Sequence, residues 1–95
     1  MLFHVKMNVR IPHDVPNEDV TKLKQTEKQR ALDLQKSGKW RHLWRVSGLY
    51  ANVSIFDVSG PDELHELLST LPLFPFMDIE VQALCPHPSA LSENG

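Results

Sequence analysis

Apolar and polar residues alternate near both ends of this 95-residue chain, and this alternation constrains the fold more than any other feature. Every second residue is apolar in residues 3–9 and again in residues 77–83. Successive side chains of a β-strand point to opposite faces, so each stretch predicts a strand with one apolar face. Pro12 and Pro86 follow these stretches and are expected to end regular structure there.

A long amphipathic helix is predicted after the first strand. Asn17 is the expected N-cap, and Gly38 is expected just past the last helical residue. Between them, the apolar residues that recur at the three- and four-residue spacing of a helix are Val20, Leu23, Ala31 and Leu34.

The middle of the chain predicts a hairpin and a second helix. Residues 40–46 and 50–58 flank a turn at Ser47 and Gly48, which is typical of two paired antiparallel strands. Leucines then recur at helical spacing until Pro72, where the second helix must stop.

The predicted order of elements is β-α-β-β-α-β, which is the ferredoxin-like, or split βαβ, arrangement. We expect one α+β domain over residues 1–95, an antiparallel four-stranded sheet with both helices on one face. Residues 86–95 are expected to form a C-terminal tail, either disordered or lying as an arm on a neighbouring subunit. The open sheet face is predicted to carry His4, Lys6, Asn52, Ser54, Asp78, Glu80 and Gln82.

A charged residue interrupts the apolar stripe of the long predicted helix. At about 100° per residue, the centre line of the stripe passes through Glu27, so its carboxylate is predicted to face the core. Burial raises the pKa of a carboxylate, and a raised pKa suits a group that transfers protons. The alternative is that Glu27 belongs to a solvated salt-bridge face with Lys24 and Lys28.

Charge and composition exclude several other classes. A formal net charge of −2 provides no basic field for nucleic acid. The single cysteine, Cys85, excludes an internal disulfide, and no clustered Cys/His spacing predicts a zinc site. No long apolar run predicts a signal peptide or a membrane span, so we expect a cytoplasmic protein without a structural metal.

Several unusual runs occur in an order that resembles one enzyme family. They are M-L-F-H-V-K-M at residues 1–7, L-K and E-K at 23–24 and 27–28, W-R-H-L-W-R at 40–45, Y-A-N and F-D-V at 50–52 and 56–58, L-P-L-F-P at 71–75, M-D-I-E-V at 77–81 and H-P-S at 87–89. Runs such as W-R-H-L-W-R are too unusual to recur in this order by chance. Over nearly its whole length, the chain resembles the muconolactone Δ-isomerases.

The resemblance implies an isomerase of catechol degradation, in the bacterial β-ketoadipate pathway of aromatic hydrocarbon catabolism. Such an enzyme converts muconolactone to 3-oxoadipate enol-lactone without a cofactor, in a homo-oligomer described for the family as a decamer. The reaction moves a proton from the ring carbon that bears the acetate arm to the carbon next to the lactone carbonyl, through a dienolate. It therefore requires a base, a donor for the dienolate oxygen and a cation for the acetate.

The predicted helix and the third strand supply candidates for these roles. Glu27 is the expected base, because one carboxylate in an apolar setting can both take and return the proton. Lys24 could hold the dienolate oxygen or the substrate carboxylate, or form only a surface pair. Tyr50, Asn52 and Ser54 form a polar row that could donate hydrogen bonds to the lactone, or line a subunit interface.

The second strand combines aromatic and basic residues. In a regular strand, Trp40, His42 and Trp44 share one face while Arg41 and Arg45 share the other, so both sets cannot face one pocket. We expect Trp40 and His42 to form the pocket wall, with core or subunit contacts as the alternative for the tryptophans. For Arg41 and Arg45 we expect ion pairs at an interface.

Three other functions stay open. A chloromuconolactone dehalogenase begins with similar proton chemistry but loses chloride. A cofactor-free ferredoxin-like monooxygenase would need a pocket for an electron-rich polyaromatic substrate. A non-catalytic ligand-binding or assembly domain would leave the burial of Glu27 as an unexplained cost.

Overall fold

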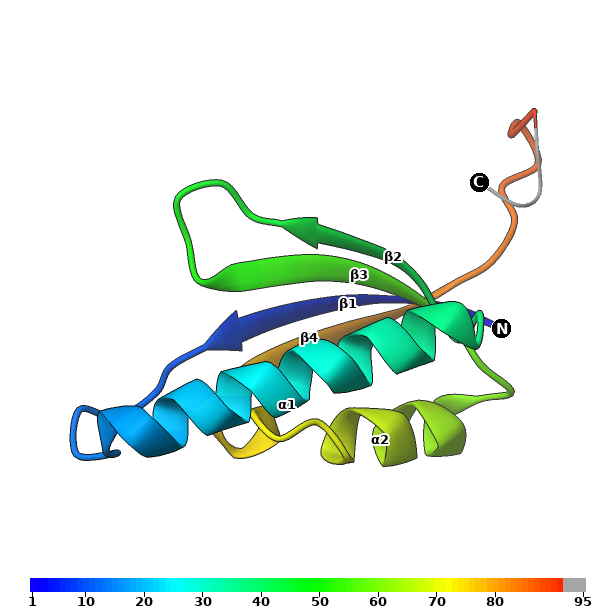
Figure 1. The fold of residues 1–95 in the computed structure, drawn as a ribbon. Helices are drawn as coiled ribbons and strands as arrows, with labels where there is room; N and C mark the ends of the chain where they lie inside the picture. The colour runs from blue at the N-terminus through cyan, green and yellow to red at the C-terminus, as the bar shows by residue number, and fades with distance from the viewer. Residues whose placement is uncertain (92–95) are drawn as a thin grey trace.

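The computed structural model describes residues 1–91, and its elements follow the predicted order (Figure 1). They are β1 (Leu2–Val9), α1 (Asn17–Lys36), β2 (Trp40–Arg45), β3 (Ala51–Asp57), α2 (Pro61–Ser69), the 3₁₀ turn η1 (Phe74–Phe76) and β4 (Met77–Leu84). The strands form one antiparallel sheet in the order β2-β3-β1-β4. Both helices lie on the same side of it, so the ferredoxin-like prediction is confirmed.

The hydrophobic core lies between the sheet and the two helices. Its buried side chains come from both layers and are Phe3, Val5, Met7, Leu34, Trp40, Phe56, Val58, Leu64, Leu68 and Leu71. On α1, the residues that are at least partly buried are Val20, Leu23, Glu27, Arg30, Ala31 and Leu34. The predicted stripe, with Glu27 at its centre, is therefore the face that packs toward the sheet, and Glu27 does not lie on a solvated face.

The ends of α1 confirm one predicted cap and correct the other. Gly38 has a φ of +84°, a left-handed conformation that favours glycine and ends the helix. Asn17 is not the N-cap, because the helix already begins there and Pro16 precedes it in an extended conformation. The carbonyl of Pro16 accepts hydrogen bonds from the N–H groups of Asp19 and Val20, so the backbone and not a side chain starts the helix.

A β-bulge interrupts the pairing of β2 with β3. Trp40 lies opposite Phe56, but the next pair is His42 with Ile55, which leaves Arg41 as an extra residue. A bulge of one residue shifts the alternation of all side chains that follow it. The face predicted for the second half of β2 is therefore reversed.

This shift redistributes the aromatic and basic side chains of β2. Trp40, Leu43 and Arg45 share the helix-facing side, whereas His42 and Trp44 lie on the open face with their rings stacked at a centroid distance of 5.1 Å. The prediction that Trp40, His42 and Trp44 share one face is wrong.

The open sheet face is less polar than predicted. Asn52 and Ser54 lie opposite Met7 and Val5, whose buried side chains face the helices, so both belong to the covered face. The prediction placed them one residue out of phase: Val53 and Ile55, which pair with Lys6 and His4, are the β3 residues that lie on the open face. The predicted residues that do alternate away from the core are His4, Lys6, Asp78, Glu80 and Gln82.

Residues 85–91 continue beyond β4 as an exposed arm without helix or strand (Figure 1). The rest of the predicted tail, residues 92–95, lies outside the described residues. Cys85, at the start of the arm, is a free and exposed thiol. Neither α1 nor α2 is long and apolar enough to cross a membrane.

Candidate active site

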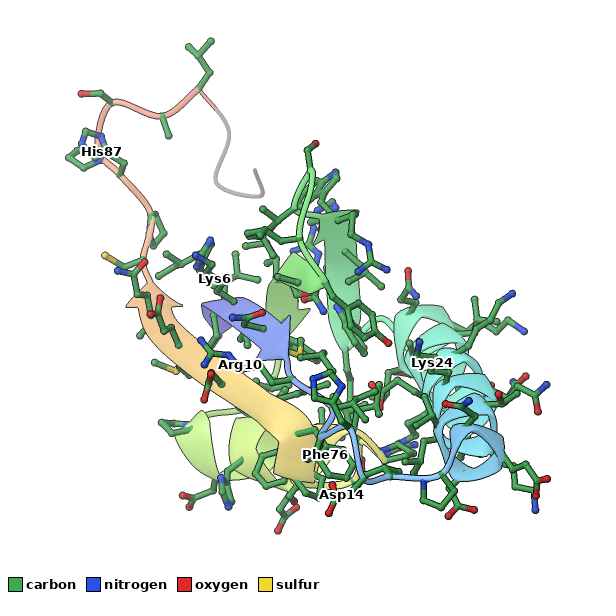
Figure 2. All side chains as sticks on the ribbon, turned by 90° about the vertical axis from the view of Figure 1, so that its left-hand side faces the viewer. Lys6, Arg10, Asp14, Lys24, Phe76 and His87 are labelled. Carbon is green, nitrogen blue, oxygen red and sulfur yellow. The ribbon has the colours of Figure 1, made fainter. Side chains whose placement is uncertain are left out.

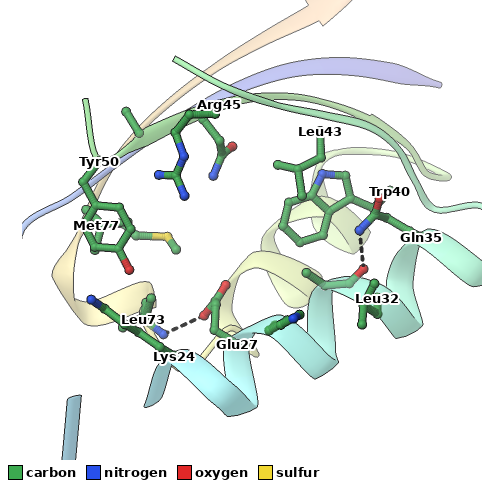
Figure 3. A pocket seen from close by; sticks show the side chains of 15 residues that line it. Lys24, Glu27, Leu32, Gln35, Trp40, Leu43, Arg45, Tyr50, Leu73 and Met77 are labelled. Atoms are coloured by element: carbon green, nitrogen blue, oxygen red, sulfur yellow. Dashed lines mark hydrogen bonds between the residues drawn. The ribbon is translucent and has the colours of Figure 1, made fainter. Parts of the chain in front are cut away.

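A pocket of about 410 Å³ opens between α1 and the sheet, chiefly over β2 and the start of β3 (Figure 3). This volume lies within the range of about 300–1,000 Å³ that is common for small-molecule sites. The residues that line the pocket are Val9, Lys24, Glu27, Lys28, Ala31, Leu32, Gln35, Trp40, Leu43, Arg45, Tyr50, Ala51, Asn52, Leu73 and Met77. Its walls are thus mainly apolar, with a few charged groups.

Glu27 projects from the middle of α1 into this pocket. Its Oε1 accepts a hydrogen bond of 2.9 Å from the backbone N–H of Leu73, which lies between α2 and η1. Partial burial raises the pKa of Glu27 and the bond from Leu73 lowers it, with burial the larger effect. A carboxylate that is held in place and has a raised pKa is suited to take and return a proton.

Three basic side chains and one carboxylate line the pocket, so its field favours an anion. The Nζ of Lys24 and the Cζ of Arg45 lie over the ring of Tyr50, at 5.0 Å and 5.3 Å from its centroid. Among residues 1–91, neither cation forms a salt bridge. Both positive charges are therefore available to a bound molecule.

Trp40 forms a flat apolar wall at the inner side of the pocket. The side chain is 2% exposed and stacks on Phe56 with ring centroids 4.8 Å apart. Leu43 lies beside the indole ring of Trp40 and also lines the pocket (Figure 3). A rigid planar wall of this kind suits a small flat ring.

Five of the predicted site residues meet in this pocket: Lys24, Glu27, Trp40, Tyr50 and Asn52. Two predicted residues do not. The prediction that His42 forms the pocket wall is wrong, because the bulge turns it to the open face. Ser54 is fully buried and does not line the pocket, but its Oγ donates a hydrogen bond of 2.8 Å to Oδ1 of Asn52. Ser54 is thus placed to orient Asn52.

Arg45 is the main site residue that the sequence interpretation missed. Regular alternation placed Arg45 with Arg41 at an interface, but Arg45 lines the pocket. Of the two, only Arg41 forms an ion pair within residues 1–91, with Nη1 at 3.7 Å from Oδ2 of Asp57. The sequence did contain an indication of the bulge. Trp40 and Leu43 are both apolar but three residues apart, and a regular strand cannot place both on its buried face.

Known proteins resemble this chain in both sequence and architecture. Residues 1–90 match the model of the family described as muconolactone delta-isomerase. The chain belongs to this family. The muconolactone Δ-isomerase of Pseudomonas putida is 55% identical over 91 residues, which is 96% of this chain and 95% of that protein. Muconolactone Δ-isomerase 2 of Acinetobacter lwoffii is 53% identical over 94 residues, 99% of this chain and 98% of that protein.

The fold agrees as closely as the sequence. A crystal structure of a muconolactone isomerase superposes with a TM-score of 0.92 at 55% identity, and the match covers 97% of this chain and 96% of that chain. The resemblance to muconolactone Δ-isomerases seen in the sequence is confirmed.

Proposed function

We propose that the protein is a muconolactone Δ-isomerase, which converts muconolactone to 3-oxoadipate enol-lactone in the catechol branch of the β-ketoadipate pathway. The observation that carries the proposal is Glu27, a carboxylate with a raised pKa in a pocket whose other charged lining groups are cations. Membership of the muconolactone Δ-isomerase family supports the same substrate.

In the proposed reaction, Glu27 starts deprotonated and takes the proton from the ring carbon that bears the acetate arm. The electron pair of that C–H bond enters the ring, and the resulting dienolate carries its charge on the lactone carbonyl oxygen. Glu27 then returns the proton to the carbon next to the carbonyl, and the double bond has moved by one position. Because no electrons leave the substrate, the proposed reaction needs no cofactor.

We assign the stabilisation of the negatively charged dienolate oxygen to a cation of the pocket, Lys24. A positive charge near the carbonyl oxygen interacts more strongly with the dienolate than with the neutral lactone, so it lowers the barrier. Lys24 lies one helical turn from Glu27 and lines the same pocket. Side chains three residues apart on a helix are neighbours, which places this cation beside the base.

The direct test is an ultraviolet assay of the purified protein with muconolactone. Wild-type protein should form the enol-lactone, and Glu27→Gln should lose most of this activity. A wild-type protein that leaves muconolactone unchanged would overturn the proposal. Faster chloride release from a chlorinated muconolactone than isomerisation of muconolactone would identify a dehalogenase instead.

We further propose a homo-oligomer larger than a dimer, for which a decamer is the size that the family resemblance implies. Large apolar side chains are exposed on both the hairpin and the arm, with Trp44 and Leu49 at 56% and Leu91 at 107%. The arm of residues 85–91 projects away from the sheet and the helices in Figure 1 and Figure 2, all of its residues are exposed, and it is proposed to lie on a neighbour. The free thiol of Cys85 is in keeping with a reducing, cytoplasmic location.

Truncation after Pro86 tests the role of the arm. The truncated chain should form a smaller assembly or lose turnover, although Glu27 and Lys24 remain in place. Light scattering and the ultraviolet assay measure the two effects. If the truncated chain keeps both its mass in solution and its turnover, the arm has no role in assembly.

A further inference from the structure

Two of the three cations that line the pocket come from different elements and lie near the ring of Tyr50, and among residues 1–91 neither of them forms a salt bridge. Lys24 projects from α1, while Arg45 projects from β2 on the other side of the pocket, and both lie near the ring of Tyr50 (Figure 3). If the proposed function holds, the substrate presents two oxygen centres that need positive charge. One is the acetate carboxylate, which is charged throughout, and the other is the carbonyl oxygen, which becomes charged only in the dienolate.

One cation cannot serve both centres. The acetate arm and the carbonyl are attached to the two ring carbons that flank the ring oxygen, so they diverge from one another. The base must lie over the ring between them, because the same carboxylate serves the carbon that loses the proton and the carbon that gains it. A site for this substrate therefore needs positive charge at two separate places.

We propose that Arg45 binds the acetate carboxylate of the substrate and that Lys24 is thereby left for the dienolate oxygen. A guanidinium presents two parallel N–H donors that match the two oxygens of a carboxylate, whereas an ammonium is a compact charge that suits a single oxygen. Lys24 lies beside Glu27 on α1, next to the reacting ring, and Arg45 faces it from the sheet.

The β-bulge at Arg41 makes this arrangement possible. Without the extra residue, Arg45 would point to the open face of the sheet, and the pocket would lose the cation that the sheet supplies, leaving only the lysines of α1. In the register after the bulge, Arg45 lies directly opposite Asn52. Because Oδ1 of Asn52 accepts the hydrogen bond from Ser54, the NH₂ group of Asn52 is left to donate beside the guanidinium.

The test compares variants on two substrates, muconolactone and its neutral methyl ester, which lacks the charged carboxylate. Arg45→Met should lower kcat/KM for muconolactone by about 10- to 100-fold, mainly through KM, because a hydrogen-bonded charge pair is lost. The same variant should change kcat/KM for the ester by less than about threefold. Arg45→Lys should recover part of the loss, since it keeps the charge but not the paired donors.

Arg41→Met is the matched control, because Arg41 lies on the same strand and outside the pocket lining. It should leave kcat and KM unchanged for both substrates. Lys24→Met should lower kcat for both substrates alike, as expected for a group that acts on the dienolate oxygen.

Two results would overturn the inference. If Arg45→Met loses the same factor on both substrates, Arg45 acts at the reacting ring or only supports the pocket. If Lys24→Met is the variant whose loss disappears with the ester, the carboxylate belongs to Lys24. These failures differ from failure of the proposed function, in which wild-type protein does not isomerise muconolactone at all.

Discussion

Replacement of Glu27 by glutamine should change activity and stability in opposite directions. General acid–base groups contribute about 10²- to 10⁴-fold to rate, so Glu27→Gln should lower kcat by at least about a hundredfold. This factor corresponds to about 2.7 kcal/mol or more of lost transition-state stabilisation. Glutamine has nearly the same shape and can still accept the hydrogen bond from Leu73, so the loss reflects chemistry and not folding.

At neutral pH, Glu27→Gln should raise the free energy of unfolding although it lowers activity. Burial raises the pKa of Glu27 above its ordinary value of 4.5, which means that the folded protein holds the charged form at a cost. Above the folded-state pKa the carboxylate is charged in both states and the cost is fully present; below about 4.5 it is neutral in both and the cost is absent. Glu27→Gln should therefore be more stable than wild type at pH 7, and this advantage should shrink toward acid pH.

A comparison of Glu27→Ala with Glu27→Gln separates the contribution of the hydrogen bond from Leu73 from that of the buried charge. Alanine removes the acceptor for the partly buried N–H of Leu73, and an unsatisfied buried donor costs about 1–3 kcal/mol. The alanine variant should thus be less stable than the glutamine variant by about that amount, although both should lose most of their activity. Urea unfolding at pH 7 and pH 5, beside the ultraviolet assay, measures each quantity.

Two outcomes would refute this reasoning. A glutamine variant that keeps more than about a tenth of wild-type turnover would remove Glu27 from the mechanism, since a general base contributes at least a hundredfold. A glutamine variant that is less stable than wild type at pH 7 would show that the carboxylate is stabilised by its surroundings, and burial would not be the larger effect on its pKa.

The remaining predictions concern pH dependence and the fold. The kcat/KM of wild type should rise with pH through an ionisation whose midpoint lies above 4.5, because burial raises the pKa of Glu27 and the base must be deprotonated; a midpoint at or below 4.5 would contradict this. Gly38→Ala should destabilise by about 1–2 kcal/mol, because its φ of +84° is left-handed, and Gly48→Ala at +82° should cost a similar amount in urea unfolding. Leu68→Ala removes a core side chain that is 4% exposed and should lower the free energy of unfolding by about 2–5 kcal/mol; a loss below 1 kcal/mol would show that the site lies outside the core.

Much of the fold was predictable because it depends on local periodicity. Alternation located β1 and β4, helical spacing located α1 and placed Glu27 on its buried face, and Gly38 marked the helix end. Each of these patterns records which side of one element is buried, and that information is carried by neighbouring residues alone.

The composition of the pocket required the tertiary structure. The bulge at Arg41 turns Arg45 into the pocket and His42 out of it, and Leu73 reaches Glu27 from 46 residues away. The spacing of Trp40 and Leu43 indicates that β2 is irregular, but local periodicity does not locate the bulge or the hydrogen bond from Leu73. The side to which a strand residue points depends on its register with the neighbouring strand, and a hydrogen bond between distant segments depends on how the packed layers bring them together. The sequence by itself therefore determined the elements and the candidate base, whereas the packing of β2, β3 and the loop after α2 against α1 decided which groups surround that base.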